Sequence, residues 1–179
     1  MTVTTDFPVV DALLGPFADA LGRDFPGYRY HVTRVLNFLF ALAPQLGEAP
    51  EPVLIAAAFH DLGIWTDGTF DYLGPSRRLA REYLAARNLA HLAPEVDAVI
   101  AHHHKVRPYR GPFALSVEAF RRADLVDVSL GLIRSGIDAP YIRAVRSALP
   151  NAGFHARLAA LTARQFLRTP LRPLPMVQW

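Results

Sequence analysis

Residues 53–61 join a long apolar run to two ionisable side chains; they read Val53-Leu54-Ile55-Ala56-Ala57-Ala58-Phe59-His60-Asp61. Because this run is apolar nearly all round, it predicts a buried, central helix. An imidazole and a carboxylate at the inner end of a buried helix cost several kcal/mol unless they are paired or bind a cation. We therefore expect His60 and Asp61 to lie beside a metal ion.

Helical spacing of apolar residues continues on both sides of this run, without the alternation typical of strands. The sequence therefore predicts an all-α fold. The expected helices cover residues 8–21, 28–43, 51–63, 77–87, 94 into the histidine run at 102–104, 116–133, 141–149 and 154–167. Pro16 is expected to kink or split the first helix, because proline removes a helical hydrogen bond. Gly63 is expected to end the third helix in a left-handed conformation, and Ser76 to cap the fourth.

The length and composition of the chain predict a single domain, residues 1–179. It combines a motif-bearing core at about 28–130 with C-terminal helices and a proline-rich tail at 131–179. With 179 residues, 51% of them hydrophobic, the chain is long enough to bury a sizeable core. It contains no cysteine, which excludes thiolate metal ligands and cysteine nucleophiles. Neither a leader peptide nor a membrane-spanning run is visible, so we expect a cytoplasmic protein without a membrane partner.

The formal net charge of +3 arises from 19 basic and 16 acidic residues that are spread along the expected helices. Without a dense basic cluster or interleaved aromatic residues, this pattern does not favour a nucleic-acid partner. A modest positive charge is compatible with attraction of a small anionic substrate. A homodimer stays open, because periodicity does not separate a buried helix face from a face shared between two copies.

Three consecutive histidines follow the helix expected from residue 94. His103 shares the helical register of Val96 and Ile100, which places it on the apolar side of that helix. His102 and His104 point to other faces. His103 is therefore the favoured site residue of the three, and His102 is the second choice.

Asp124 is a further candidate, because Phe120 and Ala123 flank it and direct its carboxylate toward the core. Together with His31, His60 and Asp61 it supplies nitrogen and oxygen ligands from well-separated helices. Such a set suits a divalent ion and leaves positions for water and substrate. The ligand types alone admit Mn, Fe, Co, Ni, Zn or Mg.

The order of these residues resembles the HD-domain superfamily of metal-dependent phosphohydrolases, in which a histidine (His31), a histidine-aspartate doublet (His60-Asp61) and a later aspartate (Asp124) follow one another. Four surrounding segments are similar to that family as well: Tyr30-His31-Val32-Thr33-Arg34-Val35, Ala57-Ala58-Phe59-His60-Asp61-Leu62-Gly63, Val99-Ile100-Ala101-His102-His103-His104 and Arg122-Ala123-Asp124-Leu125-Val126-Asp127. The resemblance spans about residues 28–130. It implies a helical bundle of the HD-domain type with a mononuclear metal site between central helices.

The resemblance also implies an activity, the hydrolysis of a small phosphate ester such as a nucleotide by a metal-activated water. The implied metal ligands are His31, His60, Asp61 and Asp124. Asp61 is in addition placed to orient the attacking water, and His103 is expected to act as an acid or base, or as a fifth ligand. Asp67, in the loop after the doublet, is a candidate for positioning water or a leaving group.

A phosphate substrate needs a basic side chain to hold it. Arg34 is the best placed candidate, because it lies one helical turn from His31. The looser candidates are Arg78, Lys105 and Arg107.

The chain departs from the family pattern after the doublet. Members with two metals carry a further histidine in the next helix, where this chain has Pro75-Ser76-Arg77-Arg78, so one divalent ion is expected. Ile64-Trp65 stands where many members have a lysine, which argues against second-messenger or large-polyphosphate substrates. An oxygenase with paired irons stays open if His102 and His103 both contribute ligands, as does a hydratase or lyase. A non-catalytic sensor or interaction module ranks last, because such members usually lose ligands.

The remaining polar and aromatic residues have structural interpretations. His91 and His155 are expected to be surface or hydrogen-bonded core histidines. Asp127 is expected to be a solvent-side or capping carboxylate. Trp65, Phe70 and Tyr72 are expected to line a pocket or to close over the core. The tail at 169–179, with its repeated prolines and Trp179, is expected to be extended and to cover a groove at most.

Overall fold

Helices α3 (Phe25–Leu42) and α4 (Glu51–Phe59) form the buried centre of the protein. Each carries a proline in its first turn, where the missing N–H costs no helical hydrogen bond. Every residue from Val53 to Phe59 is buried, which confirms that the apolar run is a central helix. The helix ends at Phe59, so His60 and Asp61 lie in the turn that follows it.

The structure, a computed structural model, describes residues 1–47, 50–171 and 174–177. All regular elements within these ranges are helical, which confirms the predicted all-α fold. The remaining α-helices are α1 (Pro8–Leu14), α2 (Ala18–Leu21), α5 (Gly63–Thr66), α6 (Leu73–Ala86), α7 (Ala93–His102), α8 (Ala114–Val128), α9 (Ala139–Ala148) and α10 (Phe154–Arg168).

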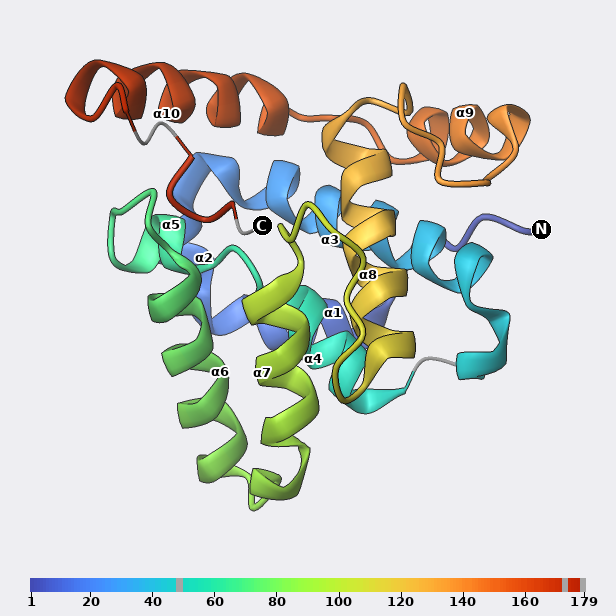
Figure 1. The fold of residues 1–179 in the computed structure, drawn as a ribbon, viewed down its shortest axis with the longest axis horizontal. Helices are drawn as coiled ribbons and strands as arrows, with labels where there is room; N and C mark the ends of the chain where they lie inside the picture. The colour runs from blue at the N-terminus through green and yellow to red at the C-terminus, as the bar shows by residue number, and fades with distance from the viewer. Residues whose placement is uncertain (48–49, 172–173, 178–179) are drawn as a thin grey trace.

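The helices are packed around α3 and α4. The most extensive contacts join α3 to α8, α4 to α7, and α6 to α7. Figure 1 shows α6 and α7 as a neighbouring pair on one side, α8 crossing α3, and α10 along the opposite edge. In this arrangement the ends of α4 and α7 come close to the middle of α3 and to α8.

The N-terminal helix is split, as Pro16 predicts. α1 ends at Leu14, a single turn of 3-10 helix spans Gly15–Phe17, and α2 begins at Ala18. Val10, Leu13 and Leu14 are buried against the core, so the split leaves the apolar face of this segment in place.

Gly63 allows two segments to approach each other closely and does not form the predicted left-handed cap. It lies inside α5, and its φ is not positive. A Cβ at this position would lie 2.7 Å from the carbonyl oxygen of Tyr72 and 2.8 Å from Cβ of Pro75. The predicted cap at Ser76 is also wrong, because Ser76 lies within α6 and its Oγ accepts a 3.0 Å hydrogen bond from the Gly63 N–H.

Helix α8 ends at Val128, five residues before the predicted boundary at Ile133. Leu130 (φ 58°) and Gly131 (φ 83°) adopt left-handed backbone, and the Gly131 N–H donates a 2.8 Å hydrogen bond to the carbonyl of Val126. This i to i−5 bond is the closing contact of a Schellman motif. The apolar residues beyond it extend the helical pattern in sequence without extending the helix.

Residues 174–177 return from α10 toward the centre of the molecule (Figure 1). Met176 is 5% exposed and forms a small second hydrophobic cluster with Ile64, Phe70 and Tyr72. This part of the tail is therefore packed against the body of the protein. The expectations for Pro173 and Trp179 concern residues outside the described ranges.

Among the described helices, none combines the length and the apolar character that a membrane crossing requires.

Candidate metal centre

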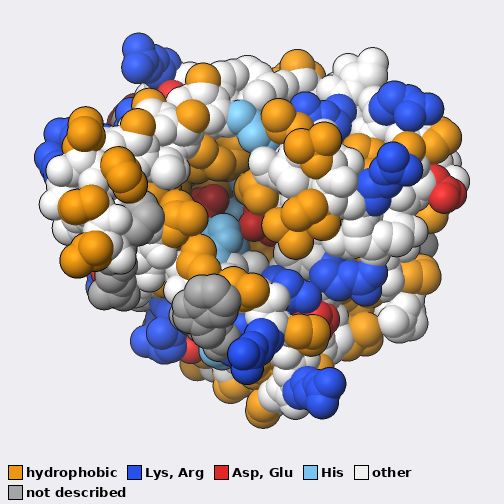
Figure 2. All heavy atoms as spheres, turned by 45° about the horizontal axis from the view of Figure 1, so that its top comes forward, with side chains coloured by type: hydrophobic (Ala, Val, Ile, Leu, Met, Phe, Trp, Pro, Cys, Tyr) orange, Lys and Arg blue, Asp and Glu red, His pale blue; other side chains and the backbone are white. Residues whose placement is uncertain are grey.

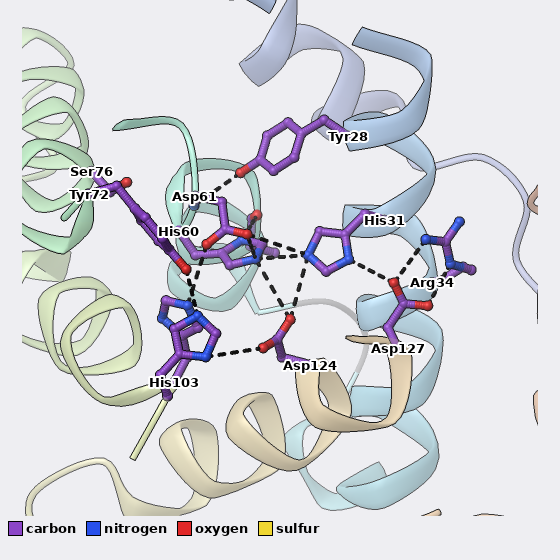
Figure 3. Close-up of polar contacts among 12 residues, drawn as sticks. Tyr28, His31, Arg34, His60, Asp61, Tyr72, Ser76, His103, Asp124 and Asp127 are labelled. Atoms are coloured by element: carbon purple, nitrogen blue, oxygen red, sulfur yellow. Dashed lines mark hydrogen bonds and ion pairs between the residues drawn. The ribbon is translucent and has the colours of Figure 1, made fainter. Parts of the chain in front are cut away.

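Four segments of the chain bring polar side chains to one buried point (Figure 3). His31 comes from α3, and His60 and Asp61 follow the last residue of α4. His103 follows α7, and Asp124 lies in α8. These five side chains belong to residues that are at most 4% exposed. The structure thus brings the four predicted ligands and His103 together.

His31, His60 and His103 all use Nδ1 as a donor to the surrounding protein. His31 donates to Oδ2 of Asp127 at 2.7 Å. His60 and His103 each donate to the backbone carbonyl three residues earlier, at 2.7 and 2.8 Å. A neutral imidazole that donates through Nδ1 keeps an unshared electron pair on Nε2. The hydrogen bonds therefore leave Nε2 of each ring available as a metal ligand.

The Nε2 atoms of His31 and His60 face each other at 3.0 Å. Two inward-facing acceptors at this distance require a cation or a proton between them. Two nitrogens bound about 2.1 Å from one metal, at roughly a right angle, lie about 3.0 Å apart, which is the spacing found here. Asp61 Oδ2 lies 3.4 Å from His60 Nε2, and Asp124 Oδ1 lies 3.5 Å from His31 Nε2. These two nitrogen and two oxygen atoms are suitable ligands for a divalent ion.

Unpartnered buried atoms mark the same point. Asp61 Oδ1, His103 Nε2 and Asp124 Oδ1 are buried and have no hydrogen-bond partner in the described part of the chain. A buried polar atom without a partner costs about 1–3 kcal/mol, and more when it is charged. Because the three atoms converge on one cluster, they mark it as a position for a bound cation and for the water that such a cation carries.

Two groups of candidate ligands share Asp61. The first group is His31, His60 and Asp61, and the second is Asp61, His103 and His104. While Asp61 Oδ2 faces His60, its Oδ1 lies 3.5 Å from Nε2 of His103. Asp124 is divided in the same way, because its Oδ2 lies 3.8 Å from Nδ1 of His104. The second group is therefore a candidate position for a further cation, which the sequence after the doublet does not indicate.

Burial sets the ionisation of the cluster. It lowers the pKa of His60 to about 3, so this imidazole stays neutral and able to bind a metal at neutral pH. Burial also raises the pKa of Asp124 to about 6. At Asp61 burial acts in the same direction, but the adjacent His60 and His103 outweigh it and hold the pKa of Asp61 below its usual range. A divalent cation at this point favours the ionised form of both carboxylates.

Asp127 is fully buried and joins His31 to Arg34. Its carboxylate accepts hydrogen bonds from Nε and Nη2 of Arg34 at 2.6 and 2.8 Å. Burial acts to raise the pKa of Asp127, yet the hydrogen bonds from His31 and Arg34 hold this pKa well below its usual range. The prediction of a solvent-side or capping carboxylate is therefore wrong. Asp127 fixes the ring of His31 and the tautomer in which Nε2 faces the cluster.

Arg34 is 1% exposed, and its guanidinium is used inside the protein. Besides its bonds to Asp127, it donates from Nη1 to the backbone carbonyls of Leu149 and Pro150 at 3.2 and 3.1 Å. A phosphate group would have to displace these buried partners. The prediction that Arg34 binds substrate is corrected accordingly: its role is to hold Asp127, and through it His31.

Among the other residues predicted to bind or position the substrate, some lie at the surface and one lies beside the cluster. Asp67 and Arg78 form a 3.0 Å ion pair with each other at the surface, so the structure does not bring Asp67 to the cluster. Arg78 also pairs with Glu82 at 3.1 Å. Arg107 lies exposed in the loop after α7. Of the four predicted phosphate-binding residues, Lys105 is the one that lines the cavity beside the cluster.

His104 belongs to the cluster, although the helical register placed it on another face. α7 ends at His102, so the register does not extend to the next two residues. Nε2 of His104 lies 2.5 Å from the hydroxyl of Tyr72. The ring of His102 stacks instead on Tyr109, with 4.7 Å between the ring centroids.

The two remaining histidines agree with their structural interpretation. His91 is exposed. His155 donates from Nε2 to the backbone carbonyl of Asp127 at 2.9 Å. Neither belongs to the candidate metal groups of the described residues.

A cavity of about 420 Å³ leads to the cluster, and Asp61, His103, His104 and Asp124 form part of its lining. Figure 2 shows the hollow, with histidine and acidic side chains in its floor and hydrophobic side chains around it. Phe70 and Tyr72 line it, as one of the two interpretations of these aromatic residues predicts. Trp65 instead donates from its indole nitrogen to Asp24 at 3.0 Å.

The chain matches a known protein family. The family model of the HD domain matches residues 28–129, a range that contains every residue of both candidate metal groups. No curated protein and no solved structure gives a significant match to the chain.

Proposed function

Because the chain belongs to the HD-domain family, whose members are mostly metal-dependent hydrolases, we propose that it is a metal-dependent phosphohydrolase. Its substrate is a small anionic phosphate ester. Water adds to phosphorus, the ester P–O bond breaks, and the alcohol leaves with a proton while inorganic phosphate is released.

One observation carries this proposal: the Nε2 atoms of His31 and His60 lie 3.0 Å apart with their Nδ1 atoms committed as donors. A divalent ion held there would lower the pKa of a coordinated water and offset negative charge on the phosphoryl oxygens. The ligands are His31, His60, Asp61 and Asp124.

The protein's own groups orient the reactants. Asp61 has an unpartnered Oδ1 that accepts a hydrogen bond from the attacking water and holds it in line with phosphorus. Nε2 of His103 lies 3.5 Å from this oxygen. It accepts a proton from the attacking water and passes it to the oxygen of the leaving alcohol. Lys105, at the cavity wall, supplies positive charge for the phosphate.

A second candidate function follows from the two groups that share Asp61. If both groups hold iron, the arrangement matches the ligand demand of an oxygenase with paired metals, since His103 and His104 supply the additional ligands. Metal count and identity separate the two proposals, because one ion is sufficient for the proposed hydrolysis.

The test combines elemental analysis of the untreated protein with phosphate release from a generic aryl phosphate in the presence of Mn, Co, Ni, Mg or Zn. We expect at least one metal ion per chain and hydrolysis that a chelator abolishes. His60→Ala should lose both the metal and the activity, whereas His91→Ala, at an exposed histidine, should retain both.

Two results would overturn the proposal. Two irons per chain with oxygen consumption and no phosphate release would favour the oxygenase. Unchanged metal content in His60→Ala would remove the cluster as the metal site.

A further inference from the structure

The cavity above the metal cluster has a polar floor and mainly hydrophobic side chains around it (Figure 2). Its floor holds the carboxylates and imidazoles of the cluster, and most of the remaining lining is apolar. Leu125 and Val128 contribute from α8, Leu158 from α10, and Leu174 and Val177 from the C-terminal segment. A ligand with its polar group at the metals therefore extends along an apolar wall.

The charge of the lining limits the polar group to a small one. Among the described residues, its cationic side chains are those of Lys105 and Arg121. Arg121 is already paired, because its Nε and Nη2 donate to the carboxylate of Glu118 at 2.8 and 2.9 Å, and its Nη1 donates to the carbonyl of Lys105. A single phosphate at the metals is compatible with this lining, whereas a polyphosphate lacks partners for its further charges among the described residues.

The apolar wall also indicates the chemical character of the part of the substrate that lies away from the phosphate. Apart from the cluster and the two cations, the described part of the lining offers the hydroxyls of Tyr72 and Thr162 as polar side-chain groups, and that of Tyr72 already contacts His104. A ribose or a base would give up hydrogen bonds to water here with little replacement. An alkyl or aromatic group instead gains from leaving water.

We propose that the substrate is a phosphate monoester of a small apolar alcohol, whose alkyl or aromatic group occupies this cavity. The inference rests on the proposed function, from which it takes the phosphate, and the cavity specifies the rest of the molecule. The volume of about 420 Å³ lies near the lower end of ligand pockets, which span roughly 300–1,000 Å³.

The C-terminal segment takes part in this specificity. Met176 anchors it against Ile64, Phe70 and Tyr72, and this contact holds Leu174 and Val177 at the cavity wall. These residues lie outside the range that the HD-domain model matches, so part of the substrate-facing wall is built by a segment that the family model does not cover.

The test measures binding rather than turnover. Ethyl-, butyl-, hexyl- and octylphosphonate keep the dianionic head group but replace the ester oxygen by carbon, so they are not hydrolysed. Their affinity for the protein is measured by calorimetry with the metal that supports hydrolysis, or with Mn²⁺ if none does. We expect about fourfold tighter binding per added methylene until the cavity is filled. Ribose 5-phosphate, with a polar body, should bind at least tenfold more weakly than hexylphosphonate.

Variants locate the effect. Val128→Trp and Thr162→Trp fill the cavity from α8 and α10, and each should abolish the gain from the longer chains. Leu132→Trp, at a residue that is 86% exposed and outside the lining, should leave the chain-length dependence unchanged. Two filling variants on different helices keep the test valid if one of them does not fold.

The outcomes separate the two proposals. Chain-length dependence without hydrolysis of any phosphate ester would uphold the apolar cavity and remove the reaction. Hydrolysis together with flat affinity across the phosphonates, or with tighter binding of ribose 5-phosphate, would uphold the reaction and overturn the substrate class. Absence of binding by all four phosphonates would overturn it as well.

Discussion

The two groups of the metal cluster differ in their access to the cavity. His31 is held by the buried Asp127, and His60 by the backbone carbonyl of Ala57 within α4, and neither histidine belongs to the cavity lining. His103 and His104 lie in the turn after α7 and in the floor of the cavity, where Nε2 of His103 has no hydrogen-bond partner among the described residues. A ligand that is closed off from the cavity retains its metal, and a group beside the cavity meets water and substrate. We infer that one side of the cluster holds the ion and the other carries out proton transfer.

The largest effect is expected from Asp61→Ala, because Asp61 is common to both groups. The change should remove most of the bound metal and reduce hydrolysis by about a thousandfold or more, since the variant loses a ligand and the group that orients water. Elemental analysis and phosphate release measure the two effects. Asp19→Ala, at an exposed carboxylate in α2, is the matched control and should behave as the wild type. Wild-type metal content in Asp61→Ala would contradict the shared role.

His103→Ala tests the group beside the cavity. We expect hydrolysis to fall by about 10²–10⁴-fold, the usual contribution of a positioned acid or base, while the ion between His31 and His60 stays bound. The same metal and activity assays apply, with His91→Ala as the control. If the variant loses all its metal, as Asp61→Ala should, then the two groups act as a single site and the distinction between them is wrong.

Asp127→Asn tests the buried group, in which Asp127 orients His31. The amide still reaches His31 but removes the charge that stabilises its orientation, so metal affinity should fall by about 10–100-fold. Titration with a competing chelator measures this constant. Asp138→Asn makes the same chemical change at an exposed position and should leave the affinity unchanged. Equal affinities in the two variants would show that the contact from His31 to Asp127 does not support metal binding.

The smallest effect concerns pH and the metal-free protein. His60 has a folded-state pKa of about 3, against about 6.5 for an unperturbed imidazole. Between these values the unfolded chain binds a proton that the folded protein excludes, so His60 lowers stability as pH falls from about 6.5 toward 3. The slope is at most about 1.4 kcal/mol per pH unit.

Asp124, whose pKa is raised to about 6, has the opposite effect between about 4 and 6, because its folded form binds the extra proton. The wild type alone therefore does not isolate the histidine. Comparison with His60→Gln does: denaturant unfolding at pH 7 and pH 5 should show a smaller loss of stability in the variant. An equal loss in both proteins would contradict the neutral, buried His60.

The sequence predicts the ligands that lie next to apolar residues. His60 and Asp61 end a fully apolar run, and His31 and Asp124 occupy the inner faces of long helices. The apolar residues next to them in the sequence therefore predict that these polar side chains are buried. The all-α fold follows from the same spacing. Local patterns are informative here because each helix presents one face to the core.

The residues that surround and orient these ligands are harder to predict from the sequence, because they depend on contacts between distant segments. Arg34 follows His31 by three residues, and Asp127 follows Asp124 by the same spacing. This parallel spacing is the one signal that could pair the two helices. His104 was misplaced because the periodicity was continued past the true end of α7 at His102. Once a helix ends, adjacent side chains are no longer about 100° apart and both can face one centre.

The contact from His31 to Asp127 joins residues separated by 96 positions in the chain, and that from Arg34 to Leu149 spans 115. Contacts of such sequence separation carry a cost in loop-closure entropy, and they slow folding. A ribosome-bound chain therefore lacks a complete metal site until α8 has been synthesised and docked on α3. We therefore expect tight loading of the ion to come late in folding, after α8 has packed on α3.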